Sequence, residues 1–205
     1  MNLFKLHSTP EILFRHADII DKHPIFFWHL YEDSPVELKK REKYIAQNAE
    51  YSLKYAKEIL EGPFPSGESA LAKDSHYALE YAREVLQGPF PKGEEVIASE
   101  CVSAYEYARD VLKGPFALGE KEIITEPEYI YYYAKYVLKE KPFPKGEPSI
   151  AKDYYYSYMY AKKILEAPFP AGEPAIATNE KTAIAYARAV LHGDFYLDGK
   201  LIAKA

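Results

Sequence analysis

Cysteine is almost absent from this sequence, since Cys101 is the only one among 205 residues. A single cysteine cannot form an internal disulfide, which excludes a disulfide framework and is typical of a reducing compartment. Long apolar runs are missing as well, so we expect no transmembrane helix and no membrane partner. The N-terminal stretch is too polar for a secretory signal, and we therefore expect a cytoplasmic protein.

An excess of basic residues is also missing. The chain has 26 Lys and Arg against 31 Asp and Glu, a formal net charge of −5. This balance argues against a nucleic-acid interface that covers the whole protein, although a local basic surface is compatible with it. Apolar residues make up 48% of the chain, which is enough for a core and excludes disorder. The unusual feature is tyrosine, with 20 copies beside ten Phe and one Trp.

Sequence patterns of catalysis are missing too. The chain has no glycine-rich phosphate loop, no nucleophile elbow and no Cys/His pair with a third residue to orient it. Four histidines crowd the N-terminal segment without the spacing of metal ligands: His7, His16, His23 and His29. We therefore predict a protein that is not an enzyme and that has no cofactor and no metal.

What the sequence does contain is a repeat. The segment ALEYAREVL recurs in six related copies, and its tyrosines are spaced 26, 26, 26, 27 and 26 residues apart. These repeat tyrosines are Tyr55, Tyr81, Tyr107, Tyr133, Tyr160 and Tyr186. Five copies are followed by a loop of the type GPFPKGE. Internal recurrence at this period is typical of a helical solenoid.

Each copy contains the signals of one long and one short helix. A column of polar residues precedes the long helix and predicts its N-cap: Asn48, Asp74, Glu100, Glu126, Asp153 and Asn179. Glutamate is the weaker cap. Glycines follow the helix, where we expect a left-handed C-cap, and the GExxIA segment predicts a short helix. At about 100° per residue, the repeat tyrosine, the next alanine and the Val/Ile and Leu four and five residues on form the buried face.

We predict an all-α fold, an α-solenoid of about six 26-residue helix pairs over residues 41–205. Residues 1–40 would form an N-terminal helical cap, with an aromatic segment at 23–31 covering the first repeat. The C-terminal stretch 193–205 would start another loop and short helix and then stop. A phenylalanine in each loop would fill the gap between successive long helices: Phe64, Phe90, Phe116, Phe143, Phe169 and Phe195.

The pattern YAxxVLxGPFPxGExxIA resembles the tandem motif of uncharacterised bacteriophage-encoded helical-repeat proteins. The resemblance covers residues 44–203 and is carried by the repeat Tyr, Ala, Leu, Phe and Glu columns. It implies a phage accessory protein in the host cytoplasm that inhibits a host or defence factor by occluding it. The motif itself describes the scaffold and specifies no chemistry.

The first candidate site is a basic column two residues after each repeat tyrosine. It lies away from the buried face and should reach the surface: Lys57, Arg83, Arg109, Lys135, Lys162 and Arg188. Tyr105, Tyr131 and Tyr158 precede three of these cations by four residues, so each pair is adjacent on the helix. Alternating cations and rings could bind single-stranded nucleic acid. The alternative is that the column pairs with the equally regular loop glutamates: Glu68, Glu94, Glu120, Glu147 and Glu173.

The second candidate site is a concentration of tyrosine in the fourth and fifth repeats. Tyr132 and Tyr136 point away from the predicted buried face, at positions where other repeats carry charge. Tyrosine offers a large, rigid contact area with a polar tip, and it is frequent at binding hot spots. With Tyr129 and Tyr155, these residues are predicted to bind a partner. The alternative is that they pack against the N-terminal segment or one another.

The combined prediction is a macromolecule-binding repeat protein whose partner is a protein. Two alternatives remain open at this point: single-stranded nucleic-acid binding through the basic column, and a structural homo-oligomer such as a dimer.

Overall fold

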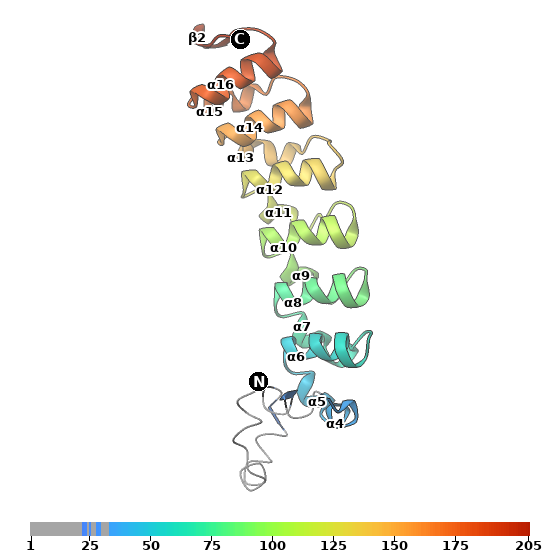
Figure 1. The fold of residues 1–205 in the computed structure, drawn as a ribbon. Helices are drawn as coiled ribbons and strands as arrows, with labels where there is room; N and C mark the ends of the chain where they lie inside the picture. The colour runs from blue at the N-terminus through green and yellow to red at the C-terminus, as the bar shows by residue number, and fades with distance from the viewer. Residues whose placement is uncertain (1–21, 24, 26–27, 30–32) are drawn as a thin grey trace. The chain divides into compact units, whose positions relative to one another are not determined.

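The computed structural model describes residues 22–23, 25, 28–29 and 33–205 (Figure 1). The chain forms two compact units, Met1–Val96 and Ile97–Ala205, which are taken separately below. Both units consist of regular repeats of a short and a long helix, so the predicted fold class is confirmed. The predicted N-terminal helix within residues 8–21, together with His7 and His16, lies outside the described residues. The domain boundary near residue 40 stays a prediction.

The first unit contains two complete helix pairs preceded by two short helices. In chain order its α-helices are α4 (Pro35–Lys39), α5 (Glu42–Ile45), α6 (Ala49–Lys54), α7 (Glu68–Leu71) and α8 (Ser75–Glu80). The long helices continue as η2 (Tyr55–Ile59) and η4 (Tyr81–Leu86). Each loop begins with a 3₁₀ turn that starts at proline, η3 (Pro65–Gly67) and η5 (Pro91–Gly93). Helix α9 (Glu94–Ile97) follows the second loop.

The second unit contains the remaining four long helices, which lie side by side in chain order (Figure 1). They begin as α10 (Cys101–Glu106), α12 (Pro127–Tyr132), α14 (Tyr154–Tyr160) and α16 (Glu180–Tyr186). They continue as η6 (Tyr107–Leu112), η7 (Tyr133–Val137), η9 (Ala161–Leu165) and η11 (Ala187–Leu191). The short helices are α11 (Glu120–Ile123), α13 (Glu147–Ile150) and α15 (Glu173–Ile176). The 3₁₀ turns are η8 (Pro144–Gly146) and η10 (Pro170–Gly172), and the chain ends in strands β1 (Phe195–Leu197) and β2 (Lys200–Ala203).

Every long helix changes from α to π near its repeat tyrosine. In η2, for example, the Leu60 N–H donates to the carbonyl of Tyr55, five residues earlier, at 2.9 Å. A π-helix is normally a single wide turn inside an α-helix. Its presence in every described long helix makes it part of the repeat. The wheel of 100° per residue therefore applies only to the first half of each long helix.

All residues of the predicted N-cap column are at the N-cap position, but only its four short members cap the helix with a side chain. Asn48, Asp74, Asp153 and Asn179 each accept a hydrogen bond from backbone N–H groups of the first turn. The side chains of Glu100 and Glu126 do not cap their helices. A short side chain reaches the first-turn amides more easily than the longer glutamate does.

Replacing an N-cap residue whose side chain accepts a first-turn hydrogen bond should therefore lower stability. Replacing an N-cap residue whose side chain makes no such bond should not. Asp153→Ala removes acceptors for the N–H groups of Tyr155 and Tyr156 and is expected to lower the free energy of unfolding by about 1 kcal/mol. Glu126→Ala is the matched control and should change it by less than about 0.5 kcal/mol. Urea unfolding followed by circular dichroism measures both. Equal losses would show that Asp153 does not act as a cap.

The helix C-caps differ from the prediction. The left-handed residue is not the glycine but the residue before it, for example Gln87, Lys113 and His192 with φ near +50°. The glycine N–H then bonds to the carbonyl of the repeat alanine, as from Gly88 to Ala82 at 3.1 Å. The left-handed residue reverses the direction of the chain, so that the N–H of the following glycine points back to the carbonyl in the last π turn. The predicted left-handed glycine caps at Gly62, Gly88, Gly114 and Gly193 are therefore wrong.

The core of each repeat is built around the repeat tyrosine, which is fully buried in every copy. The alanine after it is also fully buried, as predicted. The Val/Ile and Leu columns lie in the last turn at the edge of the core and are mostly half-buried, although Val137 and Ile164 are buried. A column that the sequence analysis missed lies three residues before the tyrosine and is buried throughout: Ser52, Ala78, Ala104, Ile130, Ser157 and Ala183.

A tyrosine clamp joins a loop to the long helix that follows it at four of the repeat tyrosines. In the fifth repeat, the Tyr160 hydroxyl accepts a hydrogen bond from the Phe143 N–H at 2.7 Å and donates to the Glu147 carboxylate at 3.1 Å. The same two bonds recur at Tyr81, Tyr133 and Tyr186. In the first repeat, Glu42 of α5 accepts from the Tyr55 hydroxyl at 2.7 Å. Helix α5 thus supplies the carboxylate that a preceding loop supplies elsewhere.

The loop phenylalanines lie where the sequence predicts them. Each ring packs on the repeat tyrosine of the helix before it, for example Phe64 on Tyr55 with centroids 5.0 Å apart and Phe143 on Tyr133 at 4.9 Å. Since the same Phe143 N–H is held by Tyr160 of the next helix, one loop residue contacts two successive repeat tyrosines. The predicted role of this column, filling the gap between long helices, is confirmed.

The ends of the array follow the prediction in part. Trp28 is buried and its ring packs 5.5 Å from that of Tyr51 in α6, so this aromatic residue does cover the first repeat. The predicted C-terminal short helix is wrong, because strands β1 and β2 pair as an antiparallel hairpin. Asp198 and Gly199 both have positive φ, which is the two-residue Asp-Gly turn of a hairpin. Phe195 keeps its place on Tyr186 at 5.3 Å.

The fourth repeat is one residue longer than the others, and the structure shows where the extra residue lies. Tyr133 and Phe143 are ten positions apart, whereas Tyr160 and Phe169 are nine apart. Both Lys139 and Glu140 are left-handed in the longer connection. The clamp after it keeps the same spacing as elsewhere, with Phe143 seventeen residues before Tyr160.

Candidate interaction surface

The four predicted partner-binding tyrosines lie on the long helices of the fourth and fifth repeats. Tyr129 and Tyr132 belong to α12, Tyr136 to η7 and Tyr155 to α14. Tyr136 and Tyr155 expose 51% and 48% of their surface, whereas Tyr129 and Tyr132 are half-buried. The structure thus brings all four into one unit but gives them different exposures.

These tyrosines belong to a continuous tyrosine cluster that spans three repeats. Ring centroids lie 5.5 Å apart between Tyr105 and Tyr129, and 6.2 Å apart between Tyr105 and Tyr132. The network continues through further contacts of 5.2–6.3 Å. The members of the tyrosine cluster are Tyr105, Tyr129, Tyr131, Tyr132, Tyr136, Tyr155 and Tyr156. The alternative that these rings pack on one another is correct for the inner members and leaves Tyr136 and Tyr155 half-exposed.

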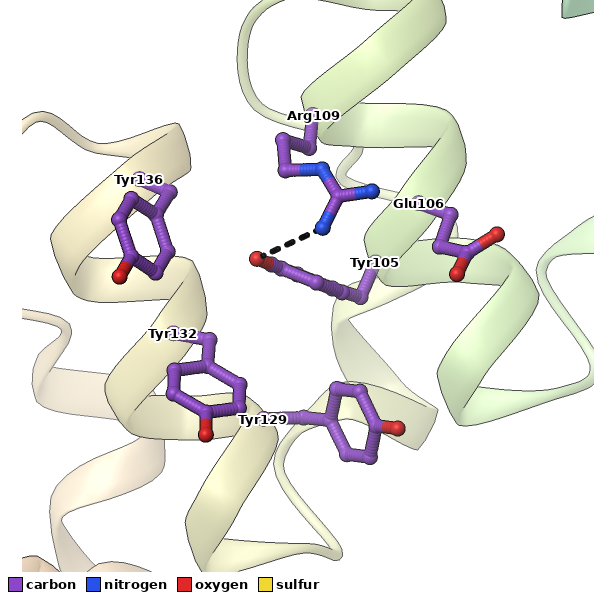
Figure 2. Close-up of a pocket in the computed structure, with 6 residues that line it drawn as sticks. All are labelled: Tyr105, Glu106, Arg109, Tyr129, Tyr132 and Tyr136. Atoms are coloured by element: carbon purple, nitrogen blue, oxygen red, sulfur yellow. Dashed lines mark hydrogen bonds between the residues drawn. The ribbon is translucent and has the colours of Figure 1, made fainter.

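An open hollow of about 450 Å³ lies between the third and fourth long helices. Figure 2 shows Tyr129, Tyr132 and Tyr136 along one side and Tyr105, Glu106 and Arg109 along the other. The Tyr105 hydroxyl accepts a hydrogen bond from Arg109 at 3.4 Å, and the guanidinium lies 5.0 Å from the centroid of the same ring. Arg109 also forms a two-bond ion pair with Asp110 at 2.6 and 2.7 Å. This pairing fixes the cation at the edge of the hollow.

Four members of the tyrosine cluster, Tyr105, Tyr129, Tyr132 and Tyr156, have a raised pKa, so their hydroxyl groups stay protonated at neutral pH and can donate hydrogen bonds. Burial raises the pKa of Tyr105 and Tyr129 above the ordinary tyrosine value. A hydrogen bond to the Glu128 carboxylate and burial raise the pKa of Tyr132. Burial first and then Glu128 raise the pKa of Tyr156. A ligand at this surface would therefore meet neutral donors and aromatic faces.

The basic column reaches the surface, as predicted, but its members have different neighbours. Lys57 forms an ion pair with Glu84 of the next repeat, and Arg83 with Glu80 of its own helix. Lys135 lies 5.6 Å from the Tyr131 centroid and 4.8 Å from that of Tyr136. Lys162 donates to the Tyr158 hydroxyl at 2.9 Å. The predicted adjacency of cation and ring is confirmed at Tyr105, Tyr131 and Tyr158.

The alternative pairing between the basic column and the loop glutamates is wrong for Glu68, Glu120, Glu147 and Glu173. All four accept from the hydroxyl of a repeat tyrosine in the clamp. Two of them also pair with a lysine of the next loop, Lys92 with Glu68 and Lys145 with Glu120, both at 2.6 Å. The loop glutamates face the loops, on a different side from the basic column.

Two rings of the predicted nucleic-acid site are not available for stacking. Tyr105 and Tyr131 expose only 4% and 3% of their surface, and Tyr158 is half-buried. The Tyr131 hydroxyl is buried and has no hydrogen-bond partner within the described part of the chain. Lys135, which could reach it, extends instead toward Tyr136. Tyr105 and Tyr131 are therefore adjacent to their cations, but they are too buried to stack on bases.

The remaining candidate groups are Cys101 and the histidines that the structure describes. Burial, with smaller effects of Glu126 and Glu122, raises the pKa of Cys101 to about 12, so its thiol is protonated. Among the residues that the structure describes, no three His, Cys, Asp or Glu side chains are grouped as metal ligands would be. His23 and His29 are the described members of the histidine group. Within the described ranges, no helix combines the length and apolar character needed to cross a bilayer.

Comparisons of the chain with protein-family models, curated proteins and solved structures found no match. The resemblance to bacteriophage repeat proteins therefore stays a prediction.

Proposed function

We propose that the chain is a non-enzymatic helical-repeat protein that binds another protein through the tyrosine cluster. The observation that carries the proposal is the continuous network from Tyr105 to Tyr155, which includes the half-exposed rings of Tyr136 and Tyr155, the first of them lining an open hollow. Aromatic anchors at the edge of a preformed hollow are typical of interface hot spots. The absence of a recognised catalytic pattern in the sequence supports the same function.

Packing accounts for some of these tyrosines and leaves others without a structural role. Tyr132 contacts the rings of Tyr105 and Tyr129, so its place in the fold is explained. Tyr136 is half-exposed and contacts the Tyr132 ring and the Lys135 ammonium group. In the first three repeats the position of Tyr136 carries an acidic residue: Glu58, Glu84 and Asp110. A large aromatic side chain at an otherwise charged surface position is what a binding surface requires.

The test uses photo-crosslinking with a benzophenone amino acid at position 136, in cells of the source organism. We expect a defined protein to cross-link at 136 and at 155. Tyr196 is the matched control, because it is 56% exposed but lies on β1 outside the tyrosine cluster. With the partner purified, Tyr136→Ala together with Tyr155→Ala should weaken binding about tenfold or more, while Tyr196→Ala leaves it unchanged. Melting temperatures of both variants should stay close to that of the parent.

Three outcomes would contradict the proposal. Equal cross-linking at 136 and 196 would show non-specific contact. Loss of the cross-linked product after nuclease treatment would favour the nucleic-acid alternative. Cross-linking of the chain only to itself would favour the structural homo-oligomer. Inhibition of a host factor by occlusion, which the phage resemblance implies, stays a further prediction that follows only once the partner is known.

A further inference from the structure

The charge of the long-helix surface changes between the first and the last three repeats. Two columns lie next to the basic column, one residue before and three residues after the repeat tyrosine. In the first three repeats they hold five acids and one lysine: Lys54, Glu58, Glu80, Glu84, Glu106 and Asp110. In the last three they hold no acid: Tyr132, Tyr136, Met159, Lys163, Ala185 and Ala189.

Among the described residues, this change leaves the basic-column cations of the last three repeats without acidic partners. Lys57, Arg83 and Arg109 each pair with a carboxylate from these columns. Lys135 and Lys162 contact tyrosines instead. Within the described part of the chain, Lys163 and Arg188 form no ion pair, and both are exposed.

These free cations lie on one surface of the second unit. The helices η7, η9 and η11 pack in chain order and present the basic column at equivalent positions. A hollow between the last two long helices has Lys162 on one side and Ala189 on the other. In the first unit the equivalent hollow has Lys57 facing Glu84, and the two form an ion pair. Glu166 also lines the later hollow without forming an ion pair.

We infer that the partner bound at the tyrosine cluster contributes an extended acidic segment, which lies across the half-buried Lys135 and the exposed Lys162, Lys163 and Arg188. This inference rests on the proposed function and specifies the chemistry of the partner. Complementary charge gives specificity and faster association, while the neighbouring aromatic anchors supply affinity. Tyr136 and Lys135 are adjacent, so the aromatic and the cationic parts of the surface are continuous.

Helix spacing sets the pattern of acids that such a segment needs. Packed helices lie about 8–10 Å apart, and a polyproline II segment advances about 3.1 Å per residue with about three residues per turn. Every third side chain of such a segment is on the same face, so an acidic residue at every third position would meet one repeat each. Single-stranded nucleic acid fits less well, because it depends on exposed rings for stacking, and Tyr131 is buried behind Lys135.

The test is a titration of the isotope-labelled full chain, observed by amide chemical shifts. The probe is a 12-residue synthetic peptide with Glu at every third position and Pro and Leu between. We expect shifts confined to η7, η9 and η11, and affinity that falls as salt rises. Lys162→Glu, Lys163→Glu and Arg188→Glu together should weaken binding at least tenfold. The matched control, with the same change in charge at exposed positions elsewhere, is Lys73→Glu, Lys152→Glu and Lys200→Glu, and it should bind within twofold of the parent.

Several results would overturn the acidic-segment inference. These are no shifts at millimolar peptide, equal shifts with a peptide carrying Lys in place of Glu, or tighter binding of oligo-dT. A second arm separates this inference from the proposed function. If the protein cross-linked at position 136 is captured equally well by the triple Glu variant, the partner is not acidic and the proposed function stands. If no protein cross-links at 136, the proposed function itself fails.

Discussion

Tyr133→Phe is expected to destabilise the second unit by about 2–3 kcal/mol, while Tyr131→Phe two residues earlier is expected to be neutral or to stabilise it. Both tyrosines are at least 97% buried in the same long helix, and both substitutions remove only a hydroxyl group. The Tyr133 hydroxyl accepts from the Phe116 N–H at 2.9 Å and donates to Glu120 at 3.2 Å. Its loss leaves the buried Phe116 amide without an acceptor and leaves Glu120, among the described residues, with only its ion pair to Lys145.

Tyr131 provides the opposite case, because its buried hydroxyl has no partner among the described residues. Removing an unsatisfied polar group recovers part of its desolvation cost, so a gain of up to about 1 kcal/mol is expected. Urea unfolding followed by circular dichroism gives both values. Equal effects of the two substitutions would show that the tyrosine clamp contributes nothing beyond burial of the ring. Burial raises the pKa of Tyr133 to about 12, so Tyr133→Phe should remove one high-pKa tyrosine from a spectrophotometric titration.

Gly172→Ala is expected to destabilise the fifth repeat by about 2 kcal/mol, despite the usual gain in chain entropy from replacing glycine. A Cβ at this position would lie 2.6 Å from the Phe169 ring and 2.7 Å from the Ser157 side chain. Phe169 cannot move away easily, because its ring packs on Tyr160 and its N–H is bound to the Tyr186 hydroxyl. The added Cβ, the Phe169 ring and the Ser157 side chain would therefore overlap, and the fold leaves the Phe169 ring little room to move.

Gly193→Ala is the matched control for this substitution. A Cβ there would meet only the Leu191 carbonyl at 3.9 Å, and φ is not positive. We expect a change within about 0.5 kcal/mol, in the stabilising direction. Ala167 already occupies the equivalent position in the fifth repeat. Thermal unfolding measures the stability of both variants relative to the parent. A Gly172→Ala protein as stable as the parent would show that the loop can relax to accommodate the added methyl group.

The sequence was sufficient to predict the repeat, its two helices and the four N-caps with short side chains. Each of these depends on a local signal, such as Asp153 before an apolar run or Pro89 after a helix end. The tyrosine clamp was missed although all of its residues had been recognised. Phe143, Glu147 and Tyr160 come together only after the chain reverses twice, and a local pattern gives no information on which columns then meet.

The change from α to π geometry was missed for a different reason. A helical wheel assumes one rotation per residue along the whole helix, and nothing in YAREVL marks where that rotation changes. The hairpin at the end of the chain, by contrast, has an ordinary signal in Asp198 and Gly199. It was overlooked because the preceding repeats led us to expect another short helix.

The candidate surface was predicted at the level of residue identity and not of exposure. The tyrosines of the fourth and fifth repeats do form one cluster, but Tyr131 is a buried residue and Tyr136 an exposed one. Whether a tyrosine on one of these helices is buried or exposed depends on the side chains that neighbouring repeats place against it. The loss of acids from the surface of the last three repeats, however, was visible in the sequence once the columns were aligned.

The longer fourth repeat shows which segment of the repeat can change in length. The clamp requires seventeen residues from the loop phenylalanine to the next repeat tyrosine, and this number is the same at Tyr81, Tyr133, Tyr160 and Tyr186. The connection from Tyr133 to Phe143 accepted an extra residue with a second left-handed residue and no change in the clamp. Insertions and deletions should therefore accumulate between the long helix and its phenylalanine. The same connection is where an engineered tag or foreign peptide could be placed without disturbing neighbouring repeats.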